Sequence, residues 1–254
     1  MGMGREVYDL EVGRAVFDAA DAAIDDLVVS RLCFEGPADA LKLTANTQPA
    51  IVTVSVALAR ALGETPDVVA GHSLGEYSAH VVAKTMSFED AVRTVRKRGG
   101  YMQDAVPPGK GAMAAILKAT REAVESVCAE VDGVAEAVNY NSAEQIVIAG
   151  EAGAIAAACA KLKEEGARAM PLPVSAPFHS SLMRPAEERL AAGEGMSGWG
   201  DVGQEPQGLL TALEALGGGL EMDLRLAGAG HAVGQADTEA AAGLAHKLAR
   251  GIAL

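Results

Sequence analysis

Gly71-His72-Ser73-Leu74-Gly75 follows a short apolar run, Asp67-Val68-Val69-Ala70, and precedes a stretch suited to a helix, residues 76–82. A strand, a glycine-bracketed serine and a helix in this order are typical of a nucleophile elbow, in which the serine occupies a strained turn. Flanking glycines remove side chains that would otherwise clash in such a turn. The pattern therefore predicts that residues 68–70 form a central strand and that Ser73 stands at its tip.

The elbow predicts a particular chemistry. Ser73 would be exposed at the mouth of a pocket, and the backbone N–H of Leu74 would point toward a developing oxyanion at the start of the next helix. This arrangement suits acyl transfer through an acyl-serine. The alternative is a strand-to-helix turn with an incidental serine, because a bare G-x-S-x-G match is weak evidence.

Composition narrows the classes of protein. With 254 residues and 50% hydrophobic content, the chain is large enough for one α/β domain, or for one domain with a smaller insert. A net charge of -13 argues against nucleic-acid binding, which needs clustered Lys and Arg. We expect no membrane span and no signal peptide, and hence a cytoplasmic protein. The three cysteines, Cys33, Cys128 and Cys159, lack metal-ligand spacing, so we assign no metal or cofactor.

Two helices flank the elbow region. Residues 48–62 have apolar side chains at helical spacing and are predicted to form a mostly buried helix that ends at Gly63. After the elbow helix, Ser87 can cap a helix that begins at Phe88, with Asp90 in the first turn. Helical periods alternate with short apolar runs along the chain, which favours an α/β architecture.

The helix that begins at Phe88 carries a charge on its apolar stripe, because Arg98 lies among residues expected to face the core. Arg93, Arg96 and Lys97 fall on the other side, where a solvated face is the ordinary interpretation. A buried guanidinium needs a partner. From periodicity alone a salt bridge to a protein carboxylate is favoured over a ligand carboxylate, and both remain open.

Pro107-Pro108-Gly109 marks a boundary. Beyond it the sequence predicts a strand, a helix, two strands, a helix and a strand, and this βαββαβ order is that of a ferredoxin-like unit. The ranges are 111–117, 121–131, 135–141, 145–149, 152–165 and 169–174. We therefore expect a small inserted α+β domain over residues 109–173.

A serine nucleophile needs a general base, and five histidines are available. His179 follows the insert in the irregular segment 173–183, His72 and His80 belong to the elbow region, and His231 and His246 lie near the end of the chain. Sequence order alone does not choose among them.

Several segments together resemble the malonyl-CoA:acyl carrier protein transacylase family, the acyltransferases of fatty acid and polyketide synthesis. The resemblance extends over about residues 2–190 and is carried by these segments: 32–37, 47–50, 71–79, Arg98 with Met102-Gln103, 111–115, 139–142 and 173–183. It implies a hydrolase-like α/β domain, residues 1–108 and 174–190, with the ferredoxin-like insert at 109–173.

The resemblance also implies roles for particular residues. Ser73 is the nucleophile, His179 its general base, and Arg98 the ligand of the malonyl carboxylate, with Leu74 as an oxyanion donor. Phe178 matches a position where related domains favour malonyl over branched acyl groups. The implied reaction moves the malonyl group from malonyl-CoA to the phosphopantetheine thiol of acyl carrier protein through a malonyl-serine, with no cofactor.

The ends of the chain depart from the family pattern. The family's opening strand and oxyanion loop precede the segment matched here, and its closing strands are replaced by a glycine-rich tail, residues 191–254, with helix-like pieces at 209–216 and 240–252. The tail is expected to be partly disordered. Two alternatives to an active transacylase follow: a truncated, catalytically impaired remnant that keeps the pocket, and a serine hydrolase that uses the same elbow.

Overall fold

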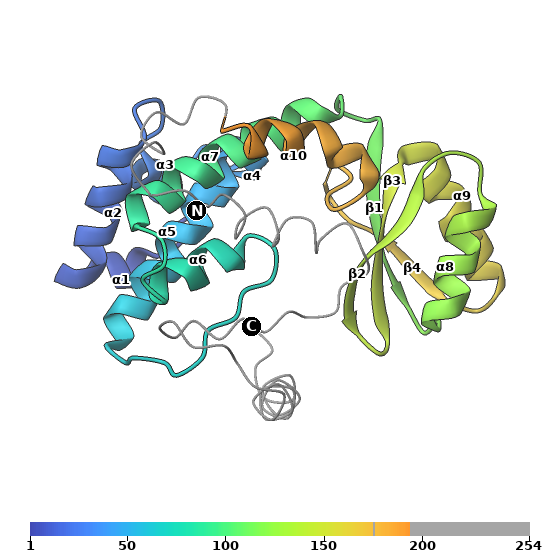
Figure 1. Cartoon of the computed structure of the whole chain (residues 1–254), viewed down its shortest axis with the longest axis horizontal. Coiled ribbons are helices and arrows are strands. Elements are labelled where there is room, and N and C mark those ends of the chain that lie inside the picture. Colours follow the sequence, from blue (N-terminus) through green and yellow to red (C-terminus); the bar gives the residue numbers. More distant parts are fainter. Residues whose placement is uncertain (175, 194–254) are drawn as a thin grey trace.

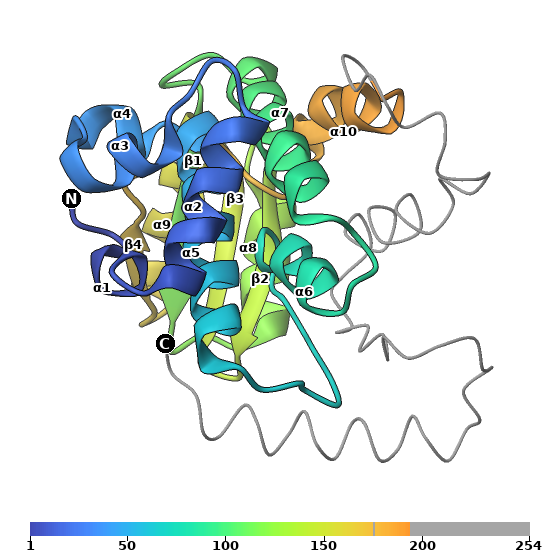
Figure 2. The same cartoon turned by 90° about the vertical axis from the view of Figure 1, so that its left-hand side faces the viewer.

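The computed structural model describes residues 1–174 and 176–193; the predicted tail helices and the last two histidines lie outside this range. The described chain has a helical body and a sheet with two helices, which lie side by side in Figure 1, while Figure 2 shows the sheet behind α2 and α5. The helical body comprises α1 (Arg5–Tyr8), α2 (Glu11–Ala23), α3 (Val29–Glu35), α4 (Ala38–Lys42), α5 (Thr44–Leu62), α6 (Gly75–Val82) and α7 (Phe88–Ala105).

Helices α2, α5 and α7 share the core of the helical body. Val16 and Phe17 of α2, Val52 of α5 and Val95 of α7 are fully buried. The cap of α7 is confirmed, since the hydroxyl of Ser87 accepts a hydrogen bond from the backbone N–H of Asp90 at 3.1 Å. Packing of these apolar stripes fixes how α5 and α7 face each other.

Gly99 of α7 lies in close contact with the backbone at the start of α5. A Cβ atom there would lie 2.6 Å from both the Cα of Ala45 and the carbonyl oxygen of Thr44, whereas one on Gly100 would meet nothing within 4 Å. We expect Gly99→Ala to lower the free energy of unfolding by about 1–3 kcal/mol or more, because backbone must move. Gly100→Ala should raise it by about 0.5–1 kcal/mol, since alanine suits a helix interior better than glycine. Urea denaturation of the pair measures both, and equal effects would contradict the close approach.

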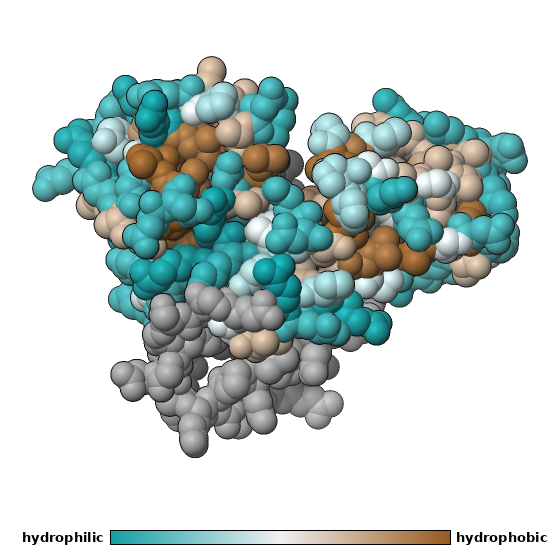
Figure 3. All heavy atoms as spheres, turned by 90° about the horizontal axis from the view of Figure 1, so that it is seen from above, coloured by the Kyte–Doolittle hydropathy of each residue, from teal (hydrophilic) through white to brown (hydrophobic). Residues whose placement is uncertain are grey.

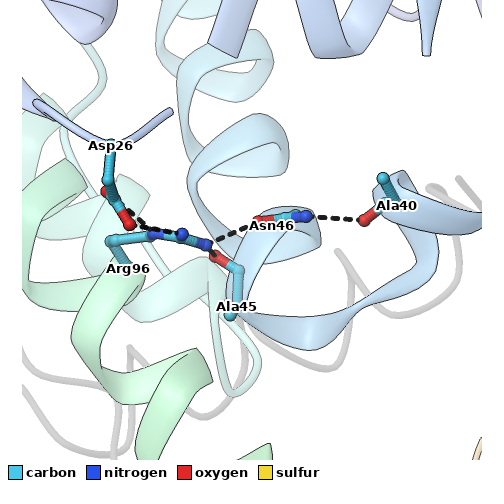
Figure 4. Close-up of polar contacts among 5 residues, drawn as sticks. All are labelled: Asp26, Ala40, Ala45, Asn46 and Arg96. Carbon is cyan, nitrogen blue, oxygen red and sulfur yellow. Dashed lines mark hydrogen bonds and ion pairs between the residues drawn. The ribbon is translucent and has the colours of Figure 1, made fainter. Parts of the chain in front are cut away.

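Helix α5 begins one turn earlier than predicted, and Arg96 explains how it continues through a proline. Pro49 lacks the N–H that would bond the carbonyl of Ala45 four residues before it. Figure 4 shows the guanidinium of Arg96 donating to that carbonyl at 2.9 Å and to the side chain of Asn46, and pairing with Asp26 at 2.7 Å. The predicted solvated face for Arg96 is therefore wrong: it is half-buried and joins α7 to α5.

Two expectations for the segment before the elbow are also wrong. Residues 68–70 form no strand, because among the described residues no neighbouring strand lies beside them to share ladder hydrogen bonds. Helix α5 is not mostly buried: Ile51, Leu58 and Leu62 are 39%, 56% and 69% exposed. The α/β class holds for the described chain as a whole, but its sheet comes from residues 111–171 and not from the elbow.

The sheet unit follows the predicted order of strands and helices. Its elements are β1 (Gly111–Leu117), α8 (Arg121–Glu130), β2 (Ala135–Ser142), β3 (Gln145–Glu151), α9 (Ala152–Glu164) and β4 (Arg168–Pro171). The strands pair antiparallel in the order β2-β3-β1-β4. Strand β4 ends three residues before the predicted end, because pairing with β1 stops at Pro171. Helices α8 and α9 cover one face, and Ile116, Ile148 and Leu162 form the core between.

The opposite face of the sheet turns toward the helical body. The chain returns there through η1 (Ser181–Met183) and α10 (Arg184–Ala191), which lies along α7 in Figure 1 and shares the buried residues Met102, Met183 and Leu190 with it. Figure 3, the view from above, shows a hollow between the two bodies at one edge. None of the described helices is long and apolar enough to cross a membrane. The three cysteines are free and buried.

Candidate active site

The serine of the elbow occupies the strained backbone that its pattern predicts. Ser73 has a φ of 52°, in the left-handed region that non-glycine residues rarely adopt. The N–H of Gly75 donates to the carbonyl of His72 at 2.9 Å, and that of Glu76 to the carbonyl of Ser73 at 3.2 Å. Helix α6 begins at Gly75, so the turn and the helix are formed although the preceding strand is not. Backbone strain of this kind is found preferentially at functional sites.

The two bracketing glycines are not equivalent. A Cβ on Gly71 would lie 2.1 Å from the carbonyl carbon and oxygen of Gly75 and 2.3 Å from the nitrogen of Glu76. A Cβ on Gly75 would meet nothing within 4 Å. Only Gly71 is therefore required by the close approach of backbone to backbone within the elbow.

Leu74 has the geometry of an oxyanion donor. It is the N-cap residue of α6 and has helical φ and ψ angles of -57° and -33°. Among the hydrogen bonds of the described residues none uses its backbone N–H, which is one of the donors that a helix start leaves unpaired. A negative oxygen bound next to Ser73 would meet this donor and the positive end of the α6 dipole.

Arg98 brings a buried positive charge to Ser73. Its side chain is 8% exposed and donates from Nη1 to Oε1 of Gln48 at 2.7 Å and from Nη2 to Oγ of Ser73 at 3.3 Å. Burial lowers the pKa of Arg98, while Tyr77 and Glu76 oppose that shift, and the guanidinium stays charged at neutral pH. No carboxylate of the described residues forms a salt bridge with it. The protein salt bridge that periodicity favoured is absent from the described chain.

Gln48 is a site residue that the sequence reasoning did not assign. It is 5% exposed, accepts from Arg98, and donates through Nε2 to the hydroxyl of Thr44 at 3.0 Å and toward the sulfur of Met102 at 3.5 Å. These contacts hold the guanidinium in place without neutralising it. A signal was available, since Gln48 lies on the same helical stripe as buried Val52 and Val56, and a polar residue there needs a buried partner.

His179 lies on a tightly held loop between the two bodies. Its φ is 65°, again left-handed, inside a turn in which the buried hydroxyl of Ser180 donates to the carbonyl of Pro177 at 2.7 Å. Pro177 packs on Gly111, where a Cβ would lie 2.3 Å from the proline ring. On the other side of the loop, the N–H of Ser181 donates to the carboxylate of Glu136 at 2.7 Å. The loop is therefore fixed to the sheet at both ends.

Burial and nearby charge make His179 a weak base. Desolvation first, then the charge of Arg98 and the neighbouring His72, lower the pKa of His179 to about 4. The rings of His72 and His179 are 6.4 Å apart between centroids. The described residues show no hydrogen bond between His179 and Ser73, whose hydroxyl is engaged by Arg98. The imidazole is neutral at neutral pH and able to accept a proton.

The other candidate residues, His72, His80 and Phe178, contact different parts of the structure. His72 is hydrogen-bonded to Asn139 of β2 at 3.2 Å, and His80 of α6 is hydrogen-bonded to Thr85 at 2.8 Å. Phe178, half-buried, packs both on the α7 and α10 cluster and on the open face of the sheet, so it borders the space beside His179. Within the described ranges no group of three His, Cys, Asp or Glu side chains could hold a metal ion. Ser73 and Leu74 of the elbow, Arg98 of α7 and the neutral His179 of the return loop thus come from three separate segments of the chain.

Comparison with known proteins points to one family. The acyl transferase domain model matches residues 1–194. The malonyl CoA-acyl carrier protein transacylase of Bacillus subtilis (strain 168) is 49% identical over 198 residues, which are 75% of this chain and 62% of the relative. The chain therefore spans less than two thirds of the length of this relative.

Solved structures agree with this likeness. An acyl-carrier-protein S-malonyltransferase from Burkholderia pseudomallei 1710b matches with a TM-score of 0.72 and 48% identity, covering 76% of this chain and 64% of that one. A malonyl-transacylase solved with its type II PKS acyl-carrier protein matches with a TM-score of 0.73 and 40% identity, again over 76% and 64% of the two chains.

Proposed function

Because this chain belongs to the acyl transferase domain family, we propose that it transfers a malonyl group from malonyl-CoA to the phosphopantetheine thiol of acyl carrier protein. The observation that carries the proposal is Arg98. A buried, charged guanidinium with no carboxylate partner in the described chain donates directly to the hydroxyl of Ser73. A free carboxylate on the acyl group would satisfy that charge with two parallel hydrogen bonds. An acyl chain without a carboxylate would not.

The first half of the reaction loads the serine. The malonyl carboxylate engages Arg98, which releases Oγ of Ser73 to donate to the neutral imidazole of His179. As His179 takes the proton, Oγ attacks the thioester carbon, and the N–H of Leu74 stabilises the oxyanion. Collapse of this intermediate expels the coenzyme A thiolate, which leaves protonated by the imidazolium. A malonyl-serine remains.

The second half unloads it. The phosphopantetheine thiol gives its proton to His179, and its sulfur attacks the malonyl ester carbon. The oxyanion again lies at Leu74, and Ser73 leaves with the proton from His179. Phe178, which borders the space beside His179, is proposed to limit the width of the acyl group. Malonyl-CoA and acyl carrier protein are the proposed partners, the pathway is fatty acid or polyketide synthesis, and the location is the cytoplasm.

The proposal extends to the domain organisation. Residues 109–173 form a ferredoxin-like insert, supported by their βαββαβ order and by the antiparallel sheet β2-β3-β1-β4. Residues 1–108 and 174–190 form the larger acyltransferase domain, supported by the packing of α10 on α7. The site lies where the two meet, with the His179 loop as the return connection.

The fate of the malonyl group tests the function. The protein is mixed with malonyl-CoA and holo acyl carrier protein, and the carrier protein is weighed by intact-mass spectrometry. We expect the carrier protein to gain one malonyl group faster than in a mixture without enzyme. Release of free malonate with an unchanged carrier protein would indicate a serine hydrolase, and no reaction by a folded protein would indicate a remnant that keeps the pocket.

The pH dependence of the reaction should report the environment of His179. The base must be neutral, and its pKa is lowered to about 4, so kcat/KM for malonyl-CoA should stay constant from neutral pH down to about pH 5. Below about pH 4 it should fall as the imidazole takes up a proton.

Removing the charge of Arg98 should raise the pKa of His179 and move this acid limb upward, although burial keeps it below the ordinary value. Stopped-flow loading at several pH values, with circular dichroism to verify folding, compares the parent protein with Arg98→Ala. An acid limb near the ordinary histidine pKa of about 6.5 in the parent protein would contradict this environment for His179.

A further inference from the structure

Strand β2 touches both loops of the candidate site through side chains on one face. Glu136 pairs with Ala149 of β3 and faces the helical body, on the same side as the cluster of Met113, Val147 and Ala149. Its carboxylate accepts from the N–H of Ser181 on the His179 loop at 2.7 Å. One of the two site loops is thereby fixed to β2.

A β-bulge gives Asn139 the same face as Glu136. Side chains three positions apart on a regular strand point to opposite faces. The register here passes from Ala137 opposite Ile148 to Asn139 opposite Val147, which leaves Val138 as the extra residue. Because Val147 faces the helical body, the bulge turns Asn139 to that side instead of toward α8 and α9. Bulges re-aim side chains in this way, often next to active sites.

The side chain of Asn139, turned toward the helical body by the bulge, contacts the elbow at His72. Asn139 is 6% exposed, and its Nδ2 lies 3.2 Å from Nε2 of His72, the residue before Ser73. With the amide in this orientation, Nδ2 of Asn139 donates and Nε2 of His72 accepts. The contact fixes the orientation of the His72 ring, whose centroid lies 6.4 Å from that of the His179 ring.

We propose that Asn139 is a positioning residue: through the imidazole of His72 it holds Ser73 in its left-handed conformation relative to Arg98 and His179. Its effect on turnover rests on the proposed function, but its effect on Ser73 does not. Together Glu136 and Asn139 make β2 the element that sets the distance between the loop of the nucleophile and the loop of the base.

The test uses a readout that needs no malonyl-CoA. A serine-directed fluorophosphonate probe is reacted with the full chain, and labelling of Ser73 is followed by mass spectrometry. Asn139→Ala should slow labelling about tenfold or more, because a misplaced nucleophile reacts poorly. Tyr140→Phe is the matched control: it removes the hydrogen bond of the next side chain to Glu125, on the opposite face of β2, and should label within about twofold of the parent protein.

A double-mutant cycle separates positioning from loss of stability. If Asn139 acts through His72, the variant with both Asn139→Ala and His72→Ala should label no more slowly than His72→Ala alone. Multiplied effects, or parent-like labelling by Asn139→Ala, would overturn the proposal. Should Asn139→Ala not fold, NMR of the parent protein decides: we expect a nuclear Overhauser effect between the side-chain amide protons of Asn139 and the ring of His72, and its absence would refute the contact. These labelling outcomes do not depend on malonyl transfer, so they would hold even if the protein transferred no malonyl group.

Discussion

Arg98→Ala should lower malonyl transfer about 100-fold or more while lowering acetyl transfer about tenfold or less. In the parent protein the malonyl carboxylate would meet a guanidinium that is 8% exposed and has no competing carboxylate among the described residues. Removing that partner leaves a buried carboxylate unpaired, which costs about 3–5 kcal/mol. An acetyl group loses only the help that Arg98 gives to Ser73 through its 3.3 Å hydrogen bond.

Transfer from malonyl-CoA and from acetyl-CoA to holo acyl carrier protein, measured side by side, gives the ratio. Arg93→Ala is the matched control, because Arg93 lies on the same helix, is exposed and pairs with Asp90 at the surface. It should change neither rate by more than about twofold, as expected for a surface ion pair. Equal losses of malonyl and acetyl transfer in Arg98→Ala would show that Arg98 supports the serine and does not select the acyl group.

Gly71→Ala should lower the reactivity of Ser73 about 100-fold or more. The added methyl group would lie 2.1 Å from the carbonyl of Gly75, a backbone group that cannot move without opening the elbow. Relief of that overlap would displace Ser73 by about 1 Å, and a displacement of this size can lower the rate about 100-fold. We expect labelling of Ser73 by a fluorophosphonate to fall at least that far.

Gly75→Ala provides the comparison, since an added methyl group there meets nothing within 4 Å and the residue begins helix α6. It should retain Ser73 labelling within a few fold and should not lower stability, because alanine is the better helix former. If the two alanine variants label alike, the elbow does not depend on the close approach at Gly71.

The parts of the site that follow local rules could be predicted from the sequence. The turn at Ser73 depends on a glycine and on the start of a helix within five residues, and both signals are local. The Ser87 cap and the alternation of strands and helices over residues 111–171 are local in the same sense. The central strand at residues 68–70 was predicted wrongly because a strand needs a hydrogen-bonded neighbour, which local sequence does not supply.

The contacts that give the site its chemistry are long-range. Helical spacing predicted that Arg98 lies on the buried stripe of α7. It could not predict the hydrogen bond of Arg98 to Gln48, which is fifty residues away in the sequence. Arg96 was wrongly assigned to solvent because its partner is not visible in the local sequence. That partner, the carbonyl of Ala45 that Pro49 leaves unpaired, reaches Arg96 only through the packing of α5 on α7. The bulge at Val138 breaks the period of two on which strand patterns depend, so the contact between Asn139 and His72 has no sequence signal.

The central claim is that Ser73 takes up the malonyl group while Arg98 holds its carboxylate. Intact-mass spectrometry of the protein after brief mixing with malonyl-CoA, without carrier protein, tests it most directly. We expect the parent protein to gain one malonyl group, located by peptide mapping on Ser73, and Ser73→Ala to gain none. A malonyl group that maps to another residue, or that appears equally in Ser73→Ala, would contradict the claim.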